Sequence, residues 1–315
     1  MPKVAKLGIL SDKTERGKEK PWRVHKVANE YLAIAYDEVN ASKAERLRAC
    51  ATTLTFSVTE QGKKRLKSAN FCRVRLCPMC AWRRALKVYS NVVKVLDGMG
   101  GSYAYLFLTL TAKNCSGEEL SGELDRLMAA WNRFVKCKPF KQAVKGWYRG
   151  LEVTHNVNPL SPSYDTFHPH FHCLLAVNKS YFKKQDYLTH ESWVKLWQKS
   201  LRADYKPVVD VRRVKGSQSR AVAEAAKYAV KSSDIIIPDD WDLTVDTVRM
   251  LDAALHNRRL VAFGGVMKEV HKQLNLEDEE TGDLIHVDGE SPTEKITDRE
   301  IIFSWWTGYQ QYVKA

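Results

Sequence analysis

The chain has 315 residues, 44% of them hydrophobic, and a formal net charge of +13. This length can bury a sizeable core, so one large domain or two modest domains are expected. No apolar run approaches the roughly 20 residues that a membrane-spanning helix needs, and the charged N-terminus lacks the apolar core of a signal peptide. The sequence is therefore interpreted as a cytoplasmic protein without a membrane partner. Its seven cysteines then argue against a disulfide scaffold.

Charge is unevenly distributed along the chain. Residues 277–300 contain ten acidic residues against Lys295 and Arg299, a net charge of −8, which leaves +21 on the remainder. A body this basic suits a polyanionic partner, nucleic acid first and an anionic membrane second. A basic cytoplasmic protein with a soluble surface would have the same composition, so charge alone does not decide the function.

The first elements in chain order are a basic arm followed by a helix (1–45), and the arm is expected to be partly disordered. A cysteine-rich hairpin and a helix follow (46–100). In this hairpin ATTLTFSV has the β-branched and aromatic residues of a strand, QGKKRLKS is interpreted as a basic turn, and the amphipathic helix runs from 81 to the glycines that end near 101.

The segment 101–235 alternates between strand and helix patterns. Strands are expected at 105–111, 150–157, 171–177 and 209–214, and helices at 118–137, 189–203 and 219–233. This order predicts an α+β fold, a sheet with helices mainly on one face. The remaining segment, 236–315, is expected to be a C-terminal extension with helices at 245–259 and 266–274, the acidic stretch and an aromatic end.

The motif HPHFH at 168–172 predicts a metal site. Side chains alternate along a strand, so His170 and His172 point to the same face, about 7 Å apart along the strand. Glu152 is the predicted third ligand, because the two neighbouring strands can pair antiparallel and place it beside the histidines. Two histidines and one carboxylate leave positions open for water and a substrate oxygen, which suits catalytic Mg²⁺ or Mn²⁺. Histidines that merely decorate a strand edge are the alternative, and His168 is a lesser candidate because a proline follows it.

A second candidate site lies on the predicted helix at 219–233. Glu224 and Tyr228 are four residues apart and Lys231 follows three later, so all three share a helix face. Tyrosine, with an ordinary pKa near 10, needs a cation or a metal to act as a nucleophile. Lys231 and the histidine-bound ion could stabilise a phenolate and a phosphodiester in reaction, and Glu224 could act as a general base. A solvated helix face with ordinary charge pairs would look the same.

Four cysteines gather in the hairpin region. Cys72, Cys77 and Cys80, with Cys50 upstream, could form a four-sulfur Zn²⁺ site that clamps the hairpin. The spacing of the last three also matches the first ligands of a plant-type [2Fe–2S] site, with Cys115 as the fourth, and reduced structural thiols remain a further alternative. Basic residues surround the cysteines, so a zinc-stabilised DNA-binding surface is predicted. Its DNA-binding residues are expected to be Arg73, Arg75, Arg83 and Arg84.

In their order along the chain, these motifs resemble the HUH endonucleases, specifically the single-tyrosine rolling-circle replication initiators of small Gram-positive-type plasmids. LFLTLTAK looks like the family's first motif, HFHCLL like its histidine motif, AEAAKYAVK like its tyrosine motif, and FCRVRLCPMCAWR like its N-terminal cysteine segment. The resemblance covers about residues 45–235. It implies a central antiparallel sheet flanked by helices, with the nicking-joining core at 101–235.

The resemblance also implies a role for each site residue. Tyr228 would be the nucleophile, His170 and His172 the metal ligands, Lys231 would stand at the expected offset, and Glu224 would activate the water that ends the cycle. Tyr228 would attack single-stranded or extruded origin DNA, form a 5′-phosphotyrosine and free a 3′-OH. A host polymerase would extend this primer while a host helicase unwinds, and strand transfer would release a circle; a homodimer is one expected assembly.

Two other functions fit the same residues. One is a non-catalytic, zinc-dependent DNA-binding regulator whose histidines are structural. The other is a related HUH transposase or conjugative relaxase, which shares the chemistry but acts in another process. Metal-dependent cleavage separates the enzyme from the regulator.

Overall fold

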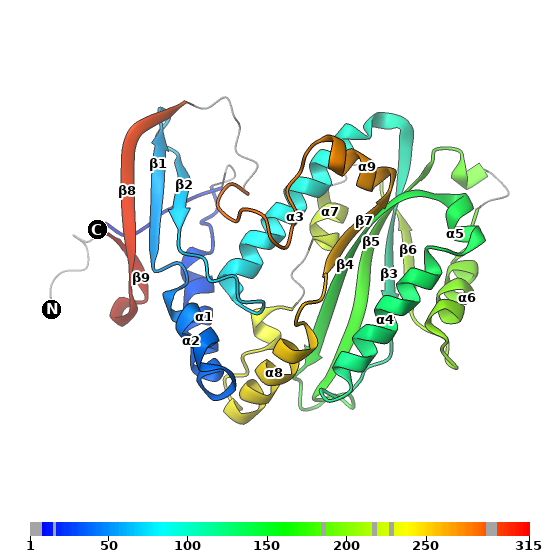
Figure 1. The fold of residues 1–315 in the computed structure, drawn as a ribbon, viewed down its shortest axis with the longest axis horizontal. Coiled ribbons are helices and arrows are strands. Elements are labelled where there is room, and N and C mark those ends of the chain that lie inside the picture. The colour runs from blue at the N-terminus through cyan, green and yellow to red at the C-terminus, as the bar shows by residue number, and fades with distance from the viewer. Residues whose placement is uncertain (1–7, 15–16, 184–186, 216–218, 227–229, 288–294) are drawn as a thin grey trace. The chain divides into compact units, whose positions relative to one another are not determined.

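The computed structural model describes residues 8–14, 17–183, 187–215, 219–226, 230–287 and 295–315. They form two compact units, each built from separate stretches of the chain (Figure 1). Unit 1 comprises Met1–Arg84, Pro238–Val248 and Asp283–Ala315, and unit 2 comprises Ala85–Ile237 and Arg249–Gly282. The structure therefore groups the four consecutive segments predicted from the sequence differently. Among the described residues, no helix is both long and apolar enough to cross a membrane.

Unit 1 combines two helices with an antiparallel sheet in the order β2-β1-β8-β9. Its elements are α1 (Trp22–Val39), α2 (Ala41–Ala49), β1 (Thr53–Thr59), β2 (Lys64–Ala69), β8 (Ile296–Trp306) and β9 (Gln311–Lys314). The core of this unit is aromatic: the ring of Phe56 lies edge-on to Trp22 at 6.0 Å and to Phe303 at 5.9 Å. Burial of these large aromatic side chains stabilises the hairpin formed by β1 and β2.

Two expectations for unit 1 need correction. The predicted basic turn contains β2, because the chain reverses already at Gly62, where φ is +79°. The C-terminal extension, expected to be helical and acidic, also contains β8 and β9, which complete the sheet begun by β1. In the described part of the basic arm, Ile9 pairs with Val313 of this sheet in an antiparallel bridge.

Unit 2 is built on an antiparallel sheet in the order β6-β3-β5-β4-β7. Its strands are β3 (Tyr103–Thr111), β4 (Val144–Asn156), β5 (Thr166–Asn178), β6 (Val209–Arg213) and β7 (Val261–Gly265). Its helices are α4 (Leu120–Phe134), α5 (Lys138–Ala143), α6 (His190–Leu201), α7 (Ser219–Ala225) and α9 (Val266–Gln273), while α3 (Pro78–Gly98) and α8 (Trp241–Ala254) span the boundaries between the units. The predicted α+β class and central antiparallel sheet are confirmed.

Helices cover both faces of this sheet, so the prediction that they lie mainly on one face is wrong. On one face Phe171 of β5 packs against Trp131 of α4 and Trp197 of α6. On the other, Leu174 and Ala176 share a core cluster with residues of α3, α7 and α9. The physical reason is that β5 carries apolar side chains in both phases of its alternation, and each apolar face must be covered.

Candidate active site and metal centres

The strand register of unit 2 brings the three predicted metal ligands together. In the β4–β5 pair Glu152 lies opposite His170, and His172 follows on the same face of β5. One carboxylate oxygen, Oε2 of Glu152, lies 2.9 Å from His172 Nε2 and 3.5 Å from His170 Nε2. All three side chains are buried, and their ligand atoms lie within 4.8 Å of one another. This separation allows one small divalent ion to be bound by all three residues.

Hydrogen bonds on the far side of each ring orient the histidines. The Nδ1–H of His170 donates to the backbone carbonyl of His168 at 3.0 Å, which turns Nε2 toward Glu152. His172 Nδ1 pairs with the Thr109 hydroxyl at 3.2 Å. Such partners fix the ring orientation in metal sites. The side chain of His168, the lesser candidate, stacks on the ring of His170 with centroids 5.1 Å apart.

The charge of Glu152 is stabilised by its neighbours. Burial raises the pKa of this carboxyl, but hydrogen bonds and charge from His170 and His172 outweigh burial and hold the pKa well below its ordinary value. Glu152 is therefore ionised at neutral pH, as a metal ligand must be. The other oxygen, Oε1, lies 3.5 Å from Nζ of Lys231, so the predicted lysine reaches the same carboxylate.

The predicted helix at 219–233 is wrong in its extent. The described helix, α7, ends at Ala225, and Lys231 has extended backbone angles (φ −82°, ψ 146°). The physical reason is a tertiary contact: the hydroxyl of Tyr148 donates to the carbonyl of Ala225 at 3.2 Å. Lys231 therefore approaches the site from an extended segment and does not share a helix face with Glu224, which is half-buried on α7. Tyr228 lies outside the described residues.

Two residues of this site were missed from the sequence. A Cβ built on Gly150 would lie 2.8 Å from the Ala225 carbonyl and 3.0 Å from the Tyr148 hydroxyl. The absence of a side chain at residue 150 therefore allows the C-terminal end of α7 to pack against β4. A glycine inside a strand, two residues before Glu152, was the available signal for such a close approach. Thr109 had a weaker signal, its position in the LFLTLTAK motif.

In unit 1 the four predicted cysteine ligands also come together. Their sulfur atoms lie within 4.8 Å of one another, with Cys50–Cys77 at 3.6 Å, Cys50–Cys80 at 3.7 Å and Cys72–Cys80 at 3.8 Å. A Zn–S bond of about 2.3 Å in a tetrahedron gives a sulfur–sulfur edge of about 3.8 Å. The spacing therefore fits four thiolates around one such ion. Backbone N–H groups of Cys72 and Arg73 point to the sulfurs of Cys50 and Cys80, and such contacts stabilise thiolate charge.

The fourth sulfur of this cluster is Cys50, whereas the iron–sulfur alternative required Cys115. The thiol of Cys115 donates to the carbonyl of Phe167 in unit 2. A buried lysine adds positive charge at the cluster, because Lys26 Nζ donates to the carbonyl of Cys50 at 2.8 Å.

The four predicted DNA-binding arginines differ in exposure. Arg83 is fully buried; it donates to the carbonyls of Leu284 and Ile285, and its guanidinium lies 5.3 Å from the ring of Trp22. Predicting it as a DNA contact is therefore wrong, since its donors are used inside unit 1. Arg73 is exposed and Arg75 and Arg84 are partly exposed, so these three can meet a ligand in solution.

Comparisons with known proteins show the family to which this chain belongs. Residues 63–313 match the Rep_1 family, described as replication protein. Protein rep of Bacillus amyloliquefaciens is 37% identical over 97% of this chain and 97% of its own length. Protein rep of Lactiplantibacillus plantarum is 37% identical over 96% and 98%, and a replication protein of Staphylococcus aureus is 33% identical over 72% and 96%. No solved structure matches significantly. The chain belongs to the replication protein (Rep) family, as the order of its motifs predicted.

Proposed function

We propose that this chain initiates rolling-circle replication of a plasmid by nicking one strand at the double-strand origin and later rejoining it. Membership of the Rep family supports a role in replication initiation. The observation that carries the nicking chemistry is the 3.5 Å approach of Lys231 to Glu152, the carboxylate that contacts both histidines. Tyr228 is three residues before Lys231 and three after Ala225, whose carbonyl is held on β4. Ala225 and Lys231, the described residues on either side of it, therefore both contact strand β4.

In this proposal Glu152, His170 and His172 hold Mg²⁺ or Mn²⁺. The donor set fits such an ion, because it offers one ionised carboxylate and two imidazole Nε2 atoms, which give up their protons when a metal binds. When bound, the ion supplies a Lewis acid for a phosphate oxygen. The ammonium of Lys231 adds a second positive charge at the same place, where negative charge grows on the phosphate in the transition state.

The chemical step is a transesterification by Tyr228. Its phenolic oxygen bonds to the phosphorus as the phenolic proton leaves, and the bond from phosphorus to the 3′ oxygen breaks. The 3′ oxygen takes up a proton and becomes the primer for a host polymerase, with a host helicase unwinding ahead. Attack of a 3′-OH on the phosphotyrosine reverses the step and rejoins a strand. Glu224 acts as the general base for the water that ends the cycle.

For unit 1 we propose a Zn²⁺ ion held by Cys50, Cys72, Cys77 and Cys80. Four thiolates at tetrahedral spacing suit this ion. Arg73, Arg75 and Arg84 would then bind origin DNA from a surface fixed by the ion. Contacts of arginine with phosphates would position the strand and make binding depend on salt.

The test is the covalent adduct. Full-length protein is incubated with labelled single-stranded origin DNA and Mn²⁺, and the conjugate is digested and identified by mass spectrometry. The expected DNA-linked peptide contains Tyr228; Tyr228→Phe and His170→Ala lose the adduct, and Tyr164→Phe, at an exposed tyrosine of the β4–β5 loop, keeps it. Binding of DNA without adduct or cleavage would instead favour the non-catalytic regulator.

A second measurement tests Glu224. Glu224→Ala is expected to form the first adduct at the normal rate and to accumulate unterminated product, because only the last step needs the base. Equal loss of nicking and termination would contradict this role.

A further inference from the structure

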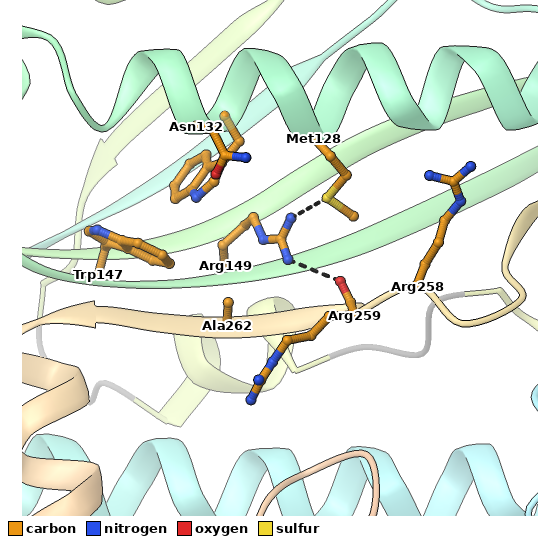
Figure 2. A pocket seen from close by; sticks show the side chains of 8 residues that line it. Met128, Asn132, Trp147, Arg149, Arg258, Arg259 and Ala262 are labelled. Atoms are coloured by element: carbon orange, nitrogen blue, oxygen red, sulfur yellow. Dashed lines mark hydrogen bonds between the residues drawn. The ribbon is translucent and has the colours of Figure 1, made fainter.

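A pocket of about 250 Å³ lies in unit 2, on the sheet face opposite Glu152 and the histidines. Figure 2 shows it between helix α4 and the paired strands β4 and β7. Residues of all three elements line it: Met128, Trp131 and Asn132 from α4, Trp147 and Arg149 from β4, and Ala262 from β7. The nicking chemistry proposed above uses none of these side chains.

The pocket contains a buried positive charge. Arg149 is 4% exposed; its Nη1 donates to the sulfur of Met128 at 2.6 Å and its Nη2 to the carbonyl of Arg259 at 3.1 Å (Figure 2). Burial lowers the pKa of Arg149 to about 10, so it stays protonated at neutral pH. Both partners are uncharged, and within the described part of the chain no carboxylate pairs with this guanidinium. A buried charge of this kind favours an anionic or strongly accepting ligand.

Two buried N–H donors of the same lining lack acceptors among the described residues. They are Nε of Arg149 and Nε1 of Trp131, the latter on a side chain that is 3% exposed. Buried donors are nearly always paired in folded proteins, so each such exception needs an explanation. Since both are donors, a ligand that carries acceptor atoms would satisfy them.

The wall beside these donors is a fixed aromatic ring. Trp147 pairs with Gly264 across the β4–β7 ladder, and a Cβ on Gly264 would lie 2.1 Å from the indole of Trp147. The indole therefore lies directly on the β7 backbone. It is also edge-on to Trp131, with ring centroids 5.0 Å apart. Trp147 remains partly exposed, which leaves ring surface for a flat ligand to stack on.

Figure 2 shows the side chain of Arg259 pointing away from the pocket, to the other side of β7, where it makes a surface ion pair with Asp278 at 2.8 Å. The pocket thus offers a ring to stack on and two buried donors. A nucleobase has the matching parts, namely a flat ring with acceptor atoms on its edge. The volume is below the roughly 300–1,000 Å³ of sites for drug-sized ligands, so it suits a single base.

We propose that this pocket binds one base of single-stranded DNA, with the ring stacked on Trp147 and its acceptor atoms at Arg149 and Trp131. The proposal rests on the proposed function in one respect, that the protein handles single-stranded DNA. The pocket would hold the strand away from the cleavage site and so increase the affinity for longer single strands. A free nucleotide shares this chemistry, and the test separates the two sources.

The test measures binding in EDTA, so that it does not depend on cleavage. The affinity of the full chain for a fluorescein-labelled 20-nucleotide strand is compared for wild type, Ala262→Leu and Trp147→Leu. Leucine at 262 narrows the pocket beside Arg149, its cross-strand partner, and Trp147→Leu removes the stacking ring at a partly exposed position. The control is Lys195→Glu, which reverses a charge at an exposed ion pair of α6.

Each pocket variant is expected to weaken binding by roughly fivefold or more, the least that a stacked base contributes, and Lys195→Glu much less. A strand with 5-iododeoxyuridine is expected to photo-crosslink to the peptide that contains Trp147.

Unchanged affinity in both pocket variants, or crosslinks only elsewhere, would overturn the proposal. So would displacement of the strand by an aspartate-rich peptide but not by unlabelled DNA, or pocket-dependent binding of free deoxynucleoside monophosphates without any effect on the strand. If the strand binds through the pocket but no tyrosine adduct ever forms, the proposed function fails and this inference stands.

Discussion

The ammonium of Lys231 lies 3.5 Å from Oε1 of Glu152, while Oε2 of the same carboxylate lies 2.9 Å from Nε2 of His172. One buried carboxylate thus joins the segment that follows Tyr228 to the ligand pair on β5. This relationship brings Lys231 to the three candidate metal ligands. It is the reason for proposing one active site for both motifs.

Lys231→Met is expected to slow adduct formation about 100-fold at saturating DNA, the effect of removing one charge that stabilises a transition state. The measurement is single-turnover formation of the DNA–protein conjugate. Lys195→Met, which breaks an exposed pair with Glu191 on α6, is the control and should leave the rate unchanged. If Lys231→Met weakened only DNA binding and left the saturated rate intact, its assigned role in the chemical step would be wrong.

Thr109→Val is expected to lower the affinity for Mn²⁺ by roughly 10- to 100-fold, the usual effect of removing a partner that orients a ligand histidine. Valine keeps the shape and the strand preference of threonine but loses the hydroxyl paired with His172 Nδ1. Thr111→Val is a close control: Thr111 lies opposite His170 across the sheet, but its hydroxyl donates to the carbonyl of Val208 and not to a histidine. Calorimetric titration with Mn²⁺ measures both variants, and equal losses in the two would contradict a specific role for Thr109.

The proximity of Glu152, His170 and His172 could be predicted from the sequence, because it depends on local rules. Alternation places His170 and His172 on one face, and the pairing of β4 with β5 needs only the short loop between them. The same rules miss contacts between distant segments. β8 pairs with β1 from the far end of the chain, and its acidic residues conceal its strand character. The end of α7 is set by Tyr148 and Gly150, which no helix propensity reports.

The sequence also did not show which of the charged residues are buried. Arg83 stands in a run of basic residues, and nothing in its neighbourhood distinguishes it from Arg84, yet its donors bind carbonyls of Leu284 and Ile285 in the core of unit 1. The cysteine cluster could be predicted better, since three of its sulfurs come from one short motif. The choice of Cys50 over Cys115 as the fourth ligand required the fold.

Cys77→Ser is expected to lose one tightly bound Zn²⁺ per chain and to destabilise unit 1, because the binding energy of a structural zinc contributes directly to folding. Cys137→Ser is the control, since this thiol is partly exposed and donates to the carbonyl of Arg133 outside the cluster. Zinc released on denaturation is measured with a chromogenic chelator, and stability by thermal unfolding. Visible absorption of the purified protein, lost together with iron in Cys77→Ser, would instead support the iron–sulfur alternative.

Acid is expected to destabilise unit 1 through His25, whose ring stacks on Trp82. Burial lowers the pKa of His25 from 6.5 to about 4. Between these values the unfolded chain binds the proton and the folded chain does not, so stability falls as the pH drops from 6.5 to 4 and this contribution changes no further below 4. The loss at pH 5 is on the order of 2 kcal/mol.

His25→Phe removes this titration and keeps an aromatic ring against Trp82. The free energy of unfolding in urea, compared at pH 7 and pH 5, should therefore fall less in the variant than in the wild type. The comparison cancels other acid effects common to both proteins, including protonation of the cysteine cluster. An equal fall in both would mean that His25 titrates normally in the folded protein.

Gly150→Ala is expected to slow adduct formation by more than tenfold while leaving Mn²⁺ affinity nearly unchanged. The added Cβ would lie 2.8 Å from the Ala225 carbonyl, closer than the backbone tolerates, so the end of α7 must move off β4. Glu224, one residue before this carbonyl, and the chain that leads to Tyr228 would move with it. Gly150 pairs with His172 across the β4–β5 ladder, but the closest contacts of the added Cβ are with Ala225 and Tyr148, so the candidate ligands are expected to keep their strand positions. The matched control is Gly122→Ala in α4, where a Cβ meets nothing within 4 Å and alanine should stabilise the helix by about 1 kcal/mol. Normal adduct formation in Gly150→Ala would show that catalysis does not depend on the position of α7. Loss of Mn²⁺ binding would show that the strain reaches the candidate ligands instead.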